Sequence, residues 1–171
     1  MASLIETLIT TLEEESSLYD ALTEESKAKT PIIVANDLQR LSEANAREQK
    51  IVDQITAISH RRNQALGEIA TVLGKDANTI TVSEVITMME KQPEFQHPLI
   101  DLKDRLLKQV EELKQINIHN EMLLKESLEM TEYSINLLQS MNLAPETANY
   151  SGTEYSGSTL GSNRPSFDAK Q

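Results

Sequence analysis

The placement of glycine and proline constrains this chain more than any other sequence feature. The five glycines and five prolines leave long stretches without either residue, as long helices require. Glycine occurs at positions 67, 74, 152, 157 and 161, and proline occurs at positions 31, 93, 98, 145 and 165. Within these stretches, apolar residues recur every three or four positions, which is typical of helices that pack side by side. We therefore expect an all-α protein, an elongated antiparallel helical bundle or coiled coil.

The same residues place the helix ends. Thr30 is a candidate N-cap with Pro31 at the first helical position, and Gly74 is a candidate helix stop. Thr81 and Glu84 form a capping-box pattern ahead of a short apolar face. Four helices are therefore predicted, over about residues 3–28, 31–73, 81–91 and 99–141.

The composition changes after Pro145, where serine, glycine, threonine and asparagine dominate. Such a segment cannot bury enough apolar surface to fold by itself. Residues 1–141 are predicted to form the helical bundle, and residues 142–171 a disordered tail.

Composition also limits the function. The formal net charge of −11 disfavours nucleic acid and anionic lipid as main partners. Without cysteine, the chain has no disulfide, no thiolate nucleophile and no common type of structural zinc site. No apolar run reaches the roughly 18 residues that a membrane span needs, and the first residues do not resemble a signal peptide. We expect a cytoplasmic protein without direct membrane insertion.

Catalytic and metal-binding patterns are weak. A di-iron bundle needs two Glu-x-x-His motifs on facing helices, and only Glu94 and His97 fit that spacing. His60 lies beside two arginines, which favours a solvated basic patch. No glycine-rich phosphate loop or zinc-protease motif occurs. We expect neither an enzyme, nor a cofactor, nor a metal site.

The second half of the last predicted long helix has a broader apolar band than one packing seam needs. Apolar residues at this spacing are usually buried against neighbouring helices. The first helix is shorter, however, and an uncovered stretch of the last helix would form a groove for a partner's amphipathic helix. Both interpretations stay open at this point.

Taken together, these segments resemble the FlgN-type flagellar export chaperones, which escort hook-associated (hook–filament junction) proteins to the flagellar type III export apparatus. The likeness is carried by "TPIIVANDLQRLSEANAREQKIVDQI", by "HRRNQALGEIATVLG", by "HNEMLLKESLEMTEYSINLL" and by a tail in which tyrosine precedes a glycine. Asn120, Leu123 and Leu124 match the Asn-x-x-Leu-Leu pattern of that family.

The resemblance implies a mechanism and a set of residues. The client is a hook-associated protein whose C-terminal region forms an amphipathic helix on the chaperone, which prevents premature assembly. The resemblance assigns client binding to Asn120, Leu123, Leu124, Leu128, Ile135 and Leu138.

The tail has a separate implied role. Tyr150 and Tyr155 fit the position of the family's tail tyrosine, which is associated with docking to the cytosolic domain of the export gate. The doubled Tyr-Ser-Gly departs from a single-tyrosine pattern. The alternative function is a structural coiled-coil scaffold or tether without a secretion client.

Overall fold

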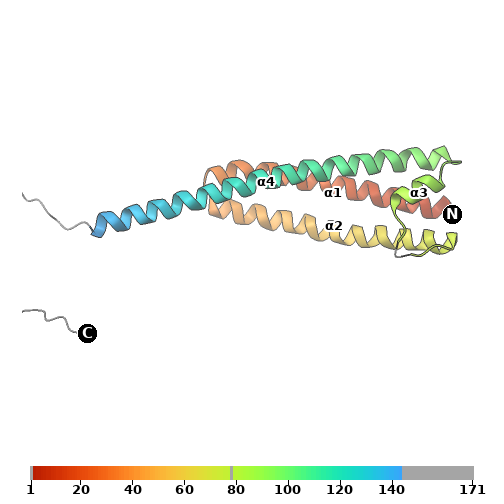
Figure 1. The fold of residues 1–171 in the computed structure, drawn as a ribbon, viewed down its shortest axis with the longest axis horizontal. Helices are drawn as coiled ribbons and strands as arrows, with labels where there is room; N and C mark the ends of the chain where they lie inside the picture. Colours follow the sequence, from red (N-terminus) through yellow and green to blue (C-terminus); the bar gives the residue numbers. More distant parts are fainter. Residues whose placement is uncertain (1, 78, 144–171) are drawn as a thin grey trace, which may run out of the picture. The chain divides into compact units, whose positions relative to one another are not determined.

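The computed structural model describes residues 2–77 and 79–143, which form four helices and no strand (Figure 1). The helices are α1 (Ala2–Val34), α2 (Leu38–Leu73), α3 (Val82–Met88) and α4 (Pro93–Leu143). The prediction of an all-α fold is confirmed. Residues 144–171, which include both tail tyrosines, lie outside the described residues.

Among the described residues, those up to Ser134 make one compact unit, and those from Ile135 to Leu143 belong to a second. Within the first unit, α1, α2 and α4 lie side by side, with α2 antiparallel to the other two (Figure 1). The short helix α3 lies at the end of the bundle where α1 begins. The predicted antiparallel bundle therefore has three long helices and one short helix that covers one end.

The predicted turn between the first two helices is wrong. Helix α1 continues through Thr30 and Pro31 and ends at Val34, six residues later than predicted. Proline within a helix removes one backbone hydrogen bond, and here the surrounding packing outweighs that loss. Thr30 is consequently a helical residue, and its side chain is free to contact α4.

The true turn is formed by Asn36 and Asp37. Asn36 has a φ of 53°, the left-handed conformation that asparagine tolerates better than most residues. The Asn36 N–H donates to the carbonyl of Ile33, and the Asp37 N–H donates to the carbonyl of Ile32, the bond pair of a Schellman motif. Asp37 then caps α2, because its carboxylate accepts a hydrogen bond from the Arg40 N–H at 3.0 Å.

The ends of the other helices are close to expectation, except at the start of α4. Gly74 ends α2 in the left-handed conformation, and the Thr81–Glu84 capping box forms with both hydrogen bonds. Helix α4 begins at Pro93, six residues earlier than predicted, with Pro98 inside it. Proline is well suited to the first position of a helix, so Pro93 starts α4 and does not break it.

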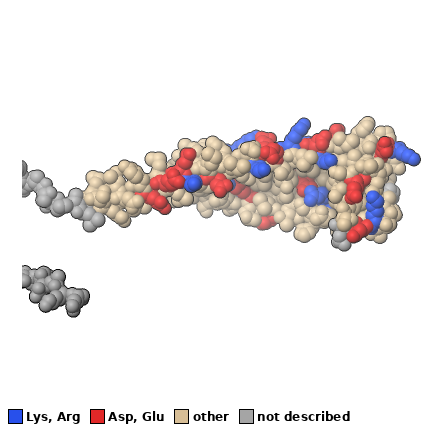
Figure 2. Space-filling model, in the orientation of Figure 1, with Lys and Arg blue, Asp and Glu red and all other residues tan. Residues whose placement is uncertain are grey.

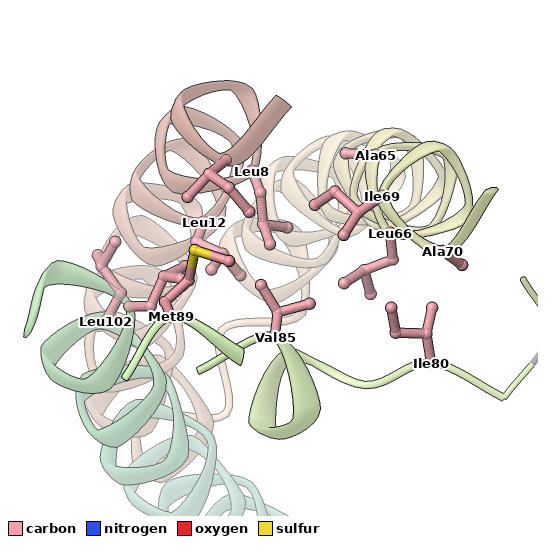
Figure 3. Close-up of a cluster of buried hydrophobic side chains, with 12 residues drawn as sticks. Leu8, Leu12, Ala65, Leu66, Ile69, Ala70, Ile80, Val85, Met89 and Leu102 are labelled. Carbon is pink, nitrogen blue, oxygen red and sulfur yellow. The ribbon is translucent and has the colours of Figure 1, made fainter. Parts of the chain in front are cut away.

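The larger apolar core lies where α3 meets the three long helices (Figure 3). Val85 points from α3 toward α1 and α2, and Met89 lies beside Leu102 of α4. Val85 and Met89, the residue that follows α3, are both buried, so this short helix closes the open end of the bundle. The buried members of the cluster are Ile5, Leu8, Leu12, Ala65, Leu66, Ile69, Ala70, Ile80, Val85, Met89, Leu99 and Leu102.

A smaller apolar cluster lies farther along the bundle. Leu22 of α1, Ile55 of α2 and Leu113 of α4 bury one another there. Polar side chains occupy the layers on either side of this cluster, and they determine how the remaining length of the bundle is held together.

Candidate functional site

A buried ion pair joins α1 to α2 between the two apolar clusters. The Glu15 side chain is only 2% exposed, and the Arg62 guanidinium donates to its two oxygens at 2.7 and 2.8 Å. Charge-assisted bonds of this length are the strong ones. Burial and, to a lesser extent, the Glu15 charge raise the pKa of the neighbouring Tyr19, while Arg62 opposes that shift.

Gln109 makes the corresponding connection between α1 and α4. Its amide N–H groups donate to the Ser16 carbonyl at 3.0 Å and to an Asp20 carboxylate oxygen at 2.6 Å. Its amide oxygen accepts from the Ser16 hydroxyl at 3.0 Å. The exposed Arg105 guanidinium contacts the other Asp20 oxygen at 2.6 Å. Because every bond crosses between helices, this layer fixes the axial position of α4 against α1.

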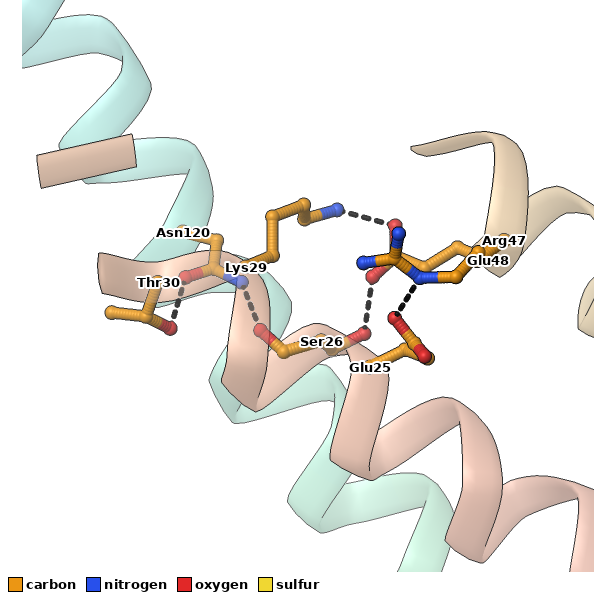
Figure 4. Close-up of polar contacts among 7 residues, drawn as sticks. All are labelled: Glu25, Ser26, Lys29, Thr30, Arg47, Glu48 and Asn120. Atoms are coloured by element: carbon orange, nitrogen blue, oxygen red, sulfur yellow. Dashed lines mark hydrogen bonds and ion pairs between the residues drawn. The ribbon is translucent and has the colours of Figure 1, made fainter. Parts of the chain in front are cut away.

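A second polar layer lies beyond the smaller cluster, around Asn120 (Figure 4). The Asn120 amide donates to the Ser26 carbonyl at 2.9 Å, and its oxygen accepts from the Thr30 hydroxyl at 2.7 Å. The Ser26 hydroxyl and the Lys29 ammonium both bind Glu48 of α2. This layer therefore ties α1 to α2 and to α4 at the same height (Figure 4).

These contacts define the position of Asn120, which the resemblance assigned to client binding. The residue is 2% exposed and its amide is engaged by α1. In this structure the asparagine of the Asn-x-x-Leu-Leu pattern faces the bundle interior, whereas the two leucines that follow it are half-buried.

The other assigned residues lie along the rest of α4. Leu124 and Leu128 meet in one groove, and Leu128 is 65% exposed. Leu123 is half-buried but does not line that groove. Ile135 and Leu138 belong to the second unit, where both are exposed.

The groove is formed by the α1–α2 turn on one side and α4 on the other, and we call it the turn groove. It has a volume of about 100 Å³. Its α4 wall consists of Leu124, Ser127, Leu128 and Thr131, and its opposite wall consists of Ile32, Ile33, Asn36, Leu38 and Leu41. Most of these residues are aliphatic, and the others are small or polar without a charge, so the groove suits an apolar side chain.

Sequence reasoning missed the wall that the turn supplies. The 3-4 spacing of Leu38 and Leu41 indicated a packing seam, but the predicted turn at Thr30 placed both residues far inside the second helix. The Asn-Asp pair at positions 36 and 37 was the signal for the real turn, because these residue types favour helix ends and N-caps. With the turn there, Leu38 is 78% exposed at the mouth of the groove.

Beyond the turn groove, α4 exposes an unusual number of large apolar side chains. Among them are Met130, Tyr133, Ile135, Leu137, Leu138 and Met141. Charged side chains of both signs are interspersed over the bundle face in Figure 2, whereas residues 133–143 contain none. Exposed apolar surface of this kind usually marks an interaction site.

Within the described residues, no three His, Asp or Glu side chains come together in a group that could hold a metal ion. Glu94 and His97, the one pair with di-iron spacing, lie in the first turns of α4 and are exposed. None of the described helices is both long and apolar enough to cross a membrane.

Comparison with known proteins gives one result. The family model described as "FlgN protein" matches residues 1–154, which is most of the chain and all four helices. Searches of the curated proteins and of the solved structures gave no match. A family model that matches along nearly the whole bundle shows that the chain belongs to the FlgN family.

Proposed function

We propose that this protein is an export chaperone that binds the C-terminal helical region of hook-associated flagellar proteins. Bound there, it prevents their premature assembly and delivers them to the flagellar type III export gate. Membership in the FlgN family supports a general role in flagellar export, and this is a family of cytosolic chaperones, not of enzymes. The identity of the client and of the docking partner is our proposal and goes beyond that general role.

The observation that carries the proposal is the exposed apolar surface of α4 beside the turn groove. Leu128 is 65% exposed although its neighbour Leu124 is half-buried in the same groove. A client helix that laid an apolar residue into the groove would cover both leucines. Covering one leucine fully stabilises a complex by about 1.5–3 kcal/mol, so a few such contacts suffice for a specific complex.

The chemistry of the surface suits a helix more than any other ligand. Helix-in-groove recognition uses anchors at 3-4 spacing, and Leu124, Leu128 and Thr131 follow that spacing on α4. The methionines near this surface are flexible and polarizable, which suits contact with more than one client sequence. A client whose own apolar face is covered in this way cannot associate with other copies of itself.

Asn120 contributes differently in this proposal. Because its amide holds the end of α1 against α4, it positions the turn that forms one wall of the groove. We therefore assign Asn120 to positioning the groove, with the client contacted by Leu124, Leu128 and the turn residues.

The tail is assigned the second contact. Tyr150 and Tyr155 are proposed to dock on the cytosolic domain of the export gate, because a ring with a polar tip is a good anchor for a short linear contact. The flanking glycines would allow the backbone to approach a partner surface closely.

The test is client binding by matched variants of α4. Leu128→Asp puts a charge into the groove, and Met122→Asp makes the same change at a residue that is exposed to a similar degree, 57%, on another face. Binding of the C-terminal segment of a hook-associated protein, measured by isothermal titration calorimetry, should weaken more than tenfold for Leu128→Asp. Met122→Asp should bind like the unchanged protein.

Leu38→Asp supplies the decisive second variant, because Leu38 begins α2 on the wall of the groove opposite α4. Leu38→Asp should weaken client binding as Leu128→Asp does, and its circular dichroism spectrum should match that of the unchanged protein. If both variants bind the client normally, the groove is not the client site. Sedimentation at several concentrations distinguishes an export chaperone from the alternative, a structural scaffold, because the scaffold requires a stable oligomer without client.

A further inference from the structure

A second apolar pocket lies at the other end of the bundle, next to α3 and away from the turn groove. It is lined by Leu12, Glu15, Tyr19, Arg62, Val82, Lys103, Leu106, Leu107 and Val110, and we call it the Tyr19 pocket. All four helices contribute to it, since α3 supplies Val82. The Asn120 layer lies between this pocket and the turn groove along α4, so the two sites are separate.

The exposure of the lining shows that this surface is not simply the edge of the core. Leu107 is 61% exposed and Val110 is 45% exposed, although both belong to an apolar lining. Together with Lys103 and Leu106 they follow a 3-4 spacing, which puts them on one side of α4. The pocket volume of about 240 Å³ is below the range of about 300–1,000 Å³ that is usual for small-molecule sites. Inserted side chains fit such a space better than a cofactor does.

The polar groups of the pocket indicate the sign of the ligand. Arg62 and Lys103 are the cations of the lining, and Glu15, already bound by Arg62, is its one carboxylate. Lys103 has no ion-pair partner, and the Tyr19 hydroxyl no hydrogen-bond partner, among the residues that the structure describes. A net positive pocket in a chain of net charge −11 favours a carboxylate-bearing ligand.

Helix α3 shows what kind of element this part of the bundle accommodates. It lies in the space between α2 and α4, where its buried Val85 and the adjoining Met89 contact the core (Figure 3). It is itself a short helix that buries Val85 and carries the acidic residue Glu84 in its first turn. The Tyr19 pocket adjoins α3 through Val82, so it offers the neighbouring position for a second helix of the same character.

We infer that the Tyr19 pocket docks a short acidic amphipathic helix of a partner protein. The apolar stripe of that helix would cover Leu106, Leu107 and Val110. One carboxylate beside the stripe would meet the Lys103 ammonium and accept a hydrogen bond from the Tyr19 hydroxyl. This site is independent of the turn groove, so it gives the protein a second contact for a folded partner while the client is bound.

The test uses the full chain and a fluorescein-labelled model peptide of about four helical turns. One peptide has a leucine stripe flanked by glutamates, and its control has the same stripe flanked by lysines. Fluorescence anisotropy should show binding of the acidic peptide at least tenfold tighter than binding of the lysine peptide. Leu107→Glu and Lys103→Glu should each weaken the acidic peptide at least tenfold, and Lys103→Glu should strengthen the lysine peptide.

Leu128→Glu is the matched control, because it adds the same charge to the turn groove and should leave peptide binding unchanged. Equal binding of both peptides, or loss caused by Leu128→Glu and not by Lys103→Glu, would overturn the assignment. Sedimentation of the unchanged protein and of Leu107→Glu tests a second copy as occupant: a dimer that this variant dissociates would also overturn it. Client binding by Leu107→Glu should be normal, so failure of this inference is distinguishable from failure of the chaperone proposal.

Discussion

The buried Glu15–Arg62 pair allows a stability prediction whose size follows from the exposure of its members. Arg62→Met keeps most of the aliphatic length of the side chain but removes both hydrogen bonds to Glu15. The Glu15 carboxylate, 2% exposed, would then have lost its ionic partner. Removing one member of a buried pair costs about 3–5 kcal/mol because a charge is left without compensation. Arg62 is 29% exposed, so water can replace part of its effect, and we expect a loss near the lower limit, about 3 kcal/mol.

The adjacent arginine provides the control. Arg61 pairs with Glu14 at 2.7 Å, yet both side chains are about half exposed. An exposed pair contributes about 0–1 kcal/mol, so Arg61→Met should change the free energy of unfolding by less than about 1 kcal/mol. The two variants change adjacent residues, yet their expected losses in the free energy of unfolding differ several-fold.

The assay is urea unfolding followed by circular dichroism at the helix band. With a slope of about 2 kcal/mol per molar urea, Arg62→Met should lower the midpoint by about 1.5 M. Replacing both members, in the double variant Glu15→Leu with Arg62→Met, should recover most of the loss, since an apolar pair of similar volume is often neutral. A loss below about 1 kcal/mol for Arg62→Met, or a double variant no more stable than the single one, would refute the reasoning.

Four further changes test other positions. Gly74→Ala should destabilise the protein by about 1 kcal/mol, because residue 74 has a φ of 65° and an added Cβ strains that conformation. Gly67→Ala should instead stabilise the protein by about 0.5–1 kcal/mol in the same urea assay, because Gly67 lies inside α2 and alanine has the higher helix propensity. The new Cβ would lie 3.7 Å from the nearest side chain, which is an ordinary contact distance. Asn120→Ala should cost about 1–3 kcal/mol, since the Ser26 carbonyl and Thr30 hydroxyl lose their partner, and thermal unfolding without that decrease would argue against the Asn120 layer. Tyr150→Ala with Tyr155→Ala should block export of the client in a secretion assay while calorimetry still shows client binding; normal export would show that the tyrosines are not the docking contact.

The fold class was predictable because it depends on patterns that extend over many residues. Apolar residues at 3-4 spacing over tens of positions can only be buried if helices pack side by side, whatever the details. The turn at Asn36 was not predicted because it depends on a local competition. Thr30 with Pro31 also forms a good helix start, and only the packing of α1 against α4 decides against it.

For the candidate site, the same periodicity gave two open interpretations of the broad apolar band of α4, burial against neighbouring helices or an uncovered surface. The structure leaves Leu128 and Met130 of this band exposed. Periodicity placed Asn120 on the packing seam of the last helix, but it could not identify the groups that its amide contacts. Its partners, Ser26 and Thr30, are some 90 residues away, and no short-range pattern connects them.

The two polar layers explain how such a narrow bundle can leave so much apolar surface uncovered. In a three-helix bundle held by apolar seams alone, an exposed apolar stripe on α4 could replace a buried one by a shift along the helix axis. The Gln109 and Asn120 contacts oppose that shift, because a displacement of α4 by one turn would leave buried amides without partners, at about 1–3 kcal/mol for each group. The bond lengths of 2.6–3.0 Å in these layers show that the present alignment satisfies both amides. The buried polar residues thus keep the apolar side chains of α4 on the surface, where the client helix that we propose would contact them.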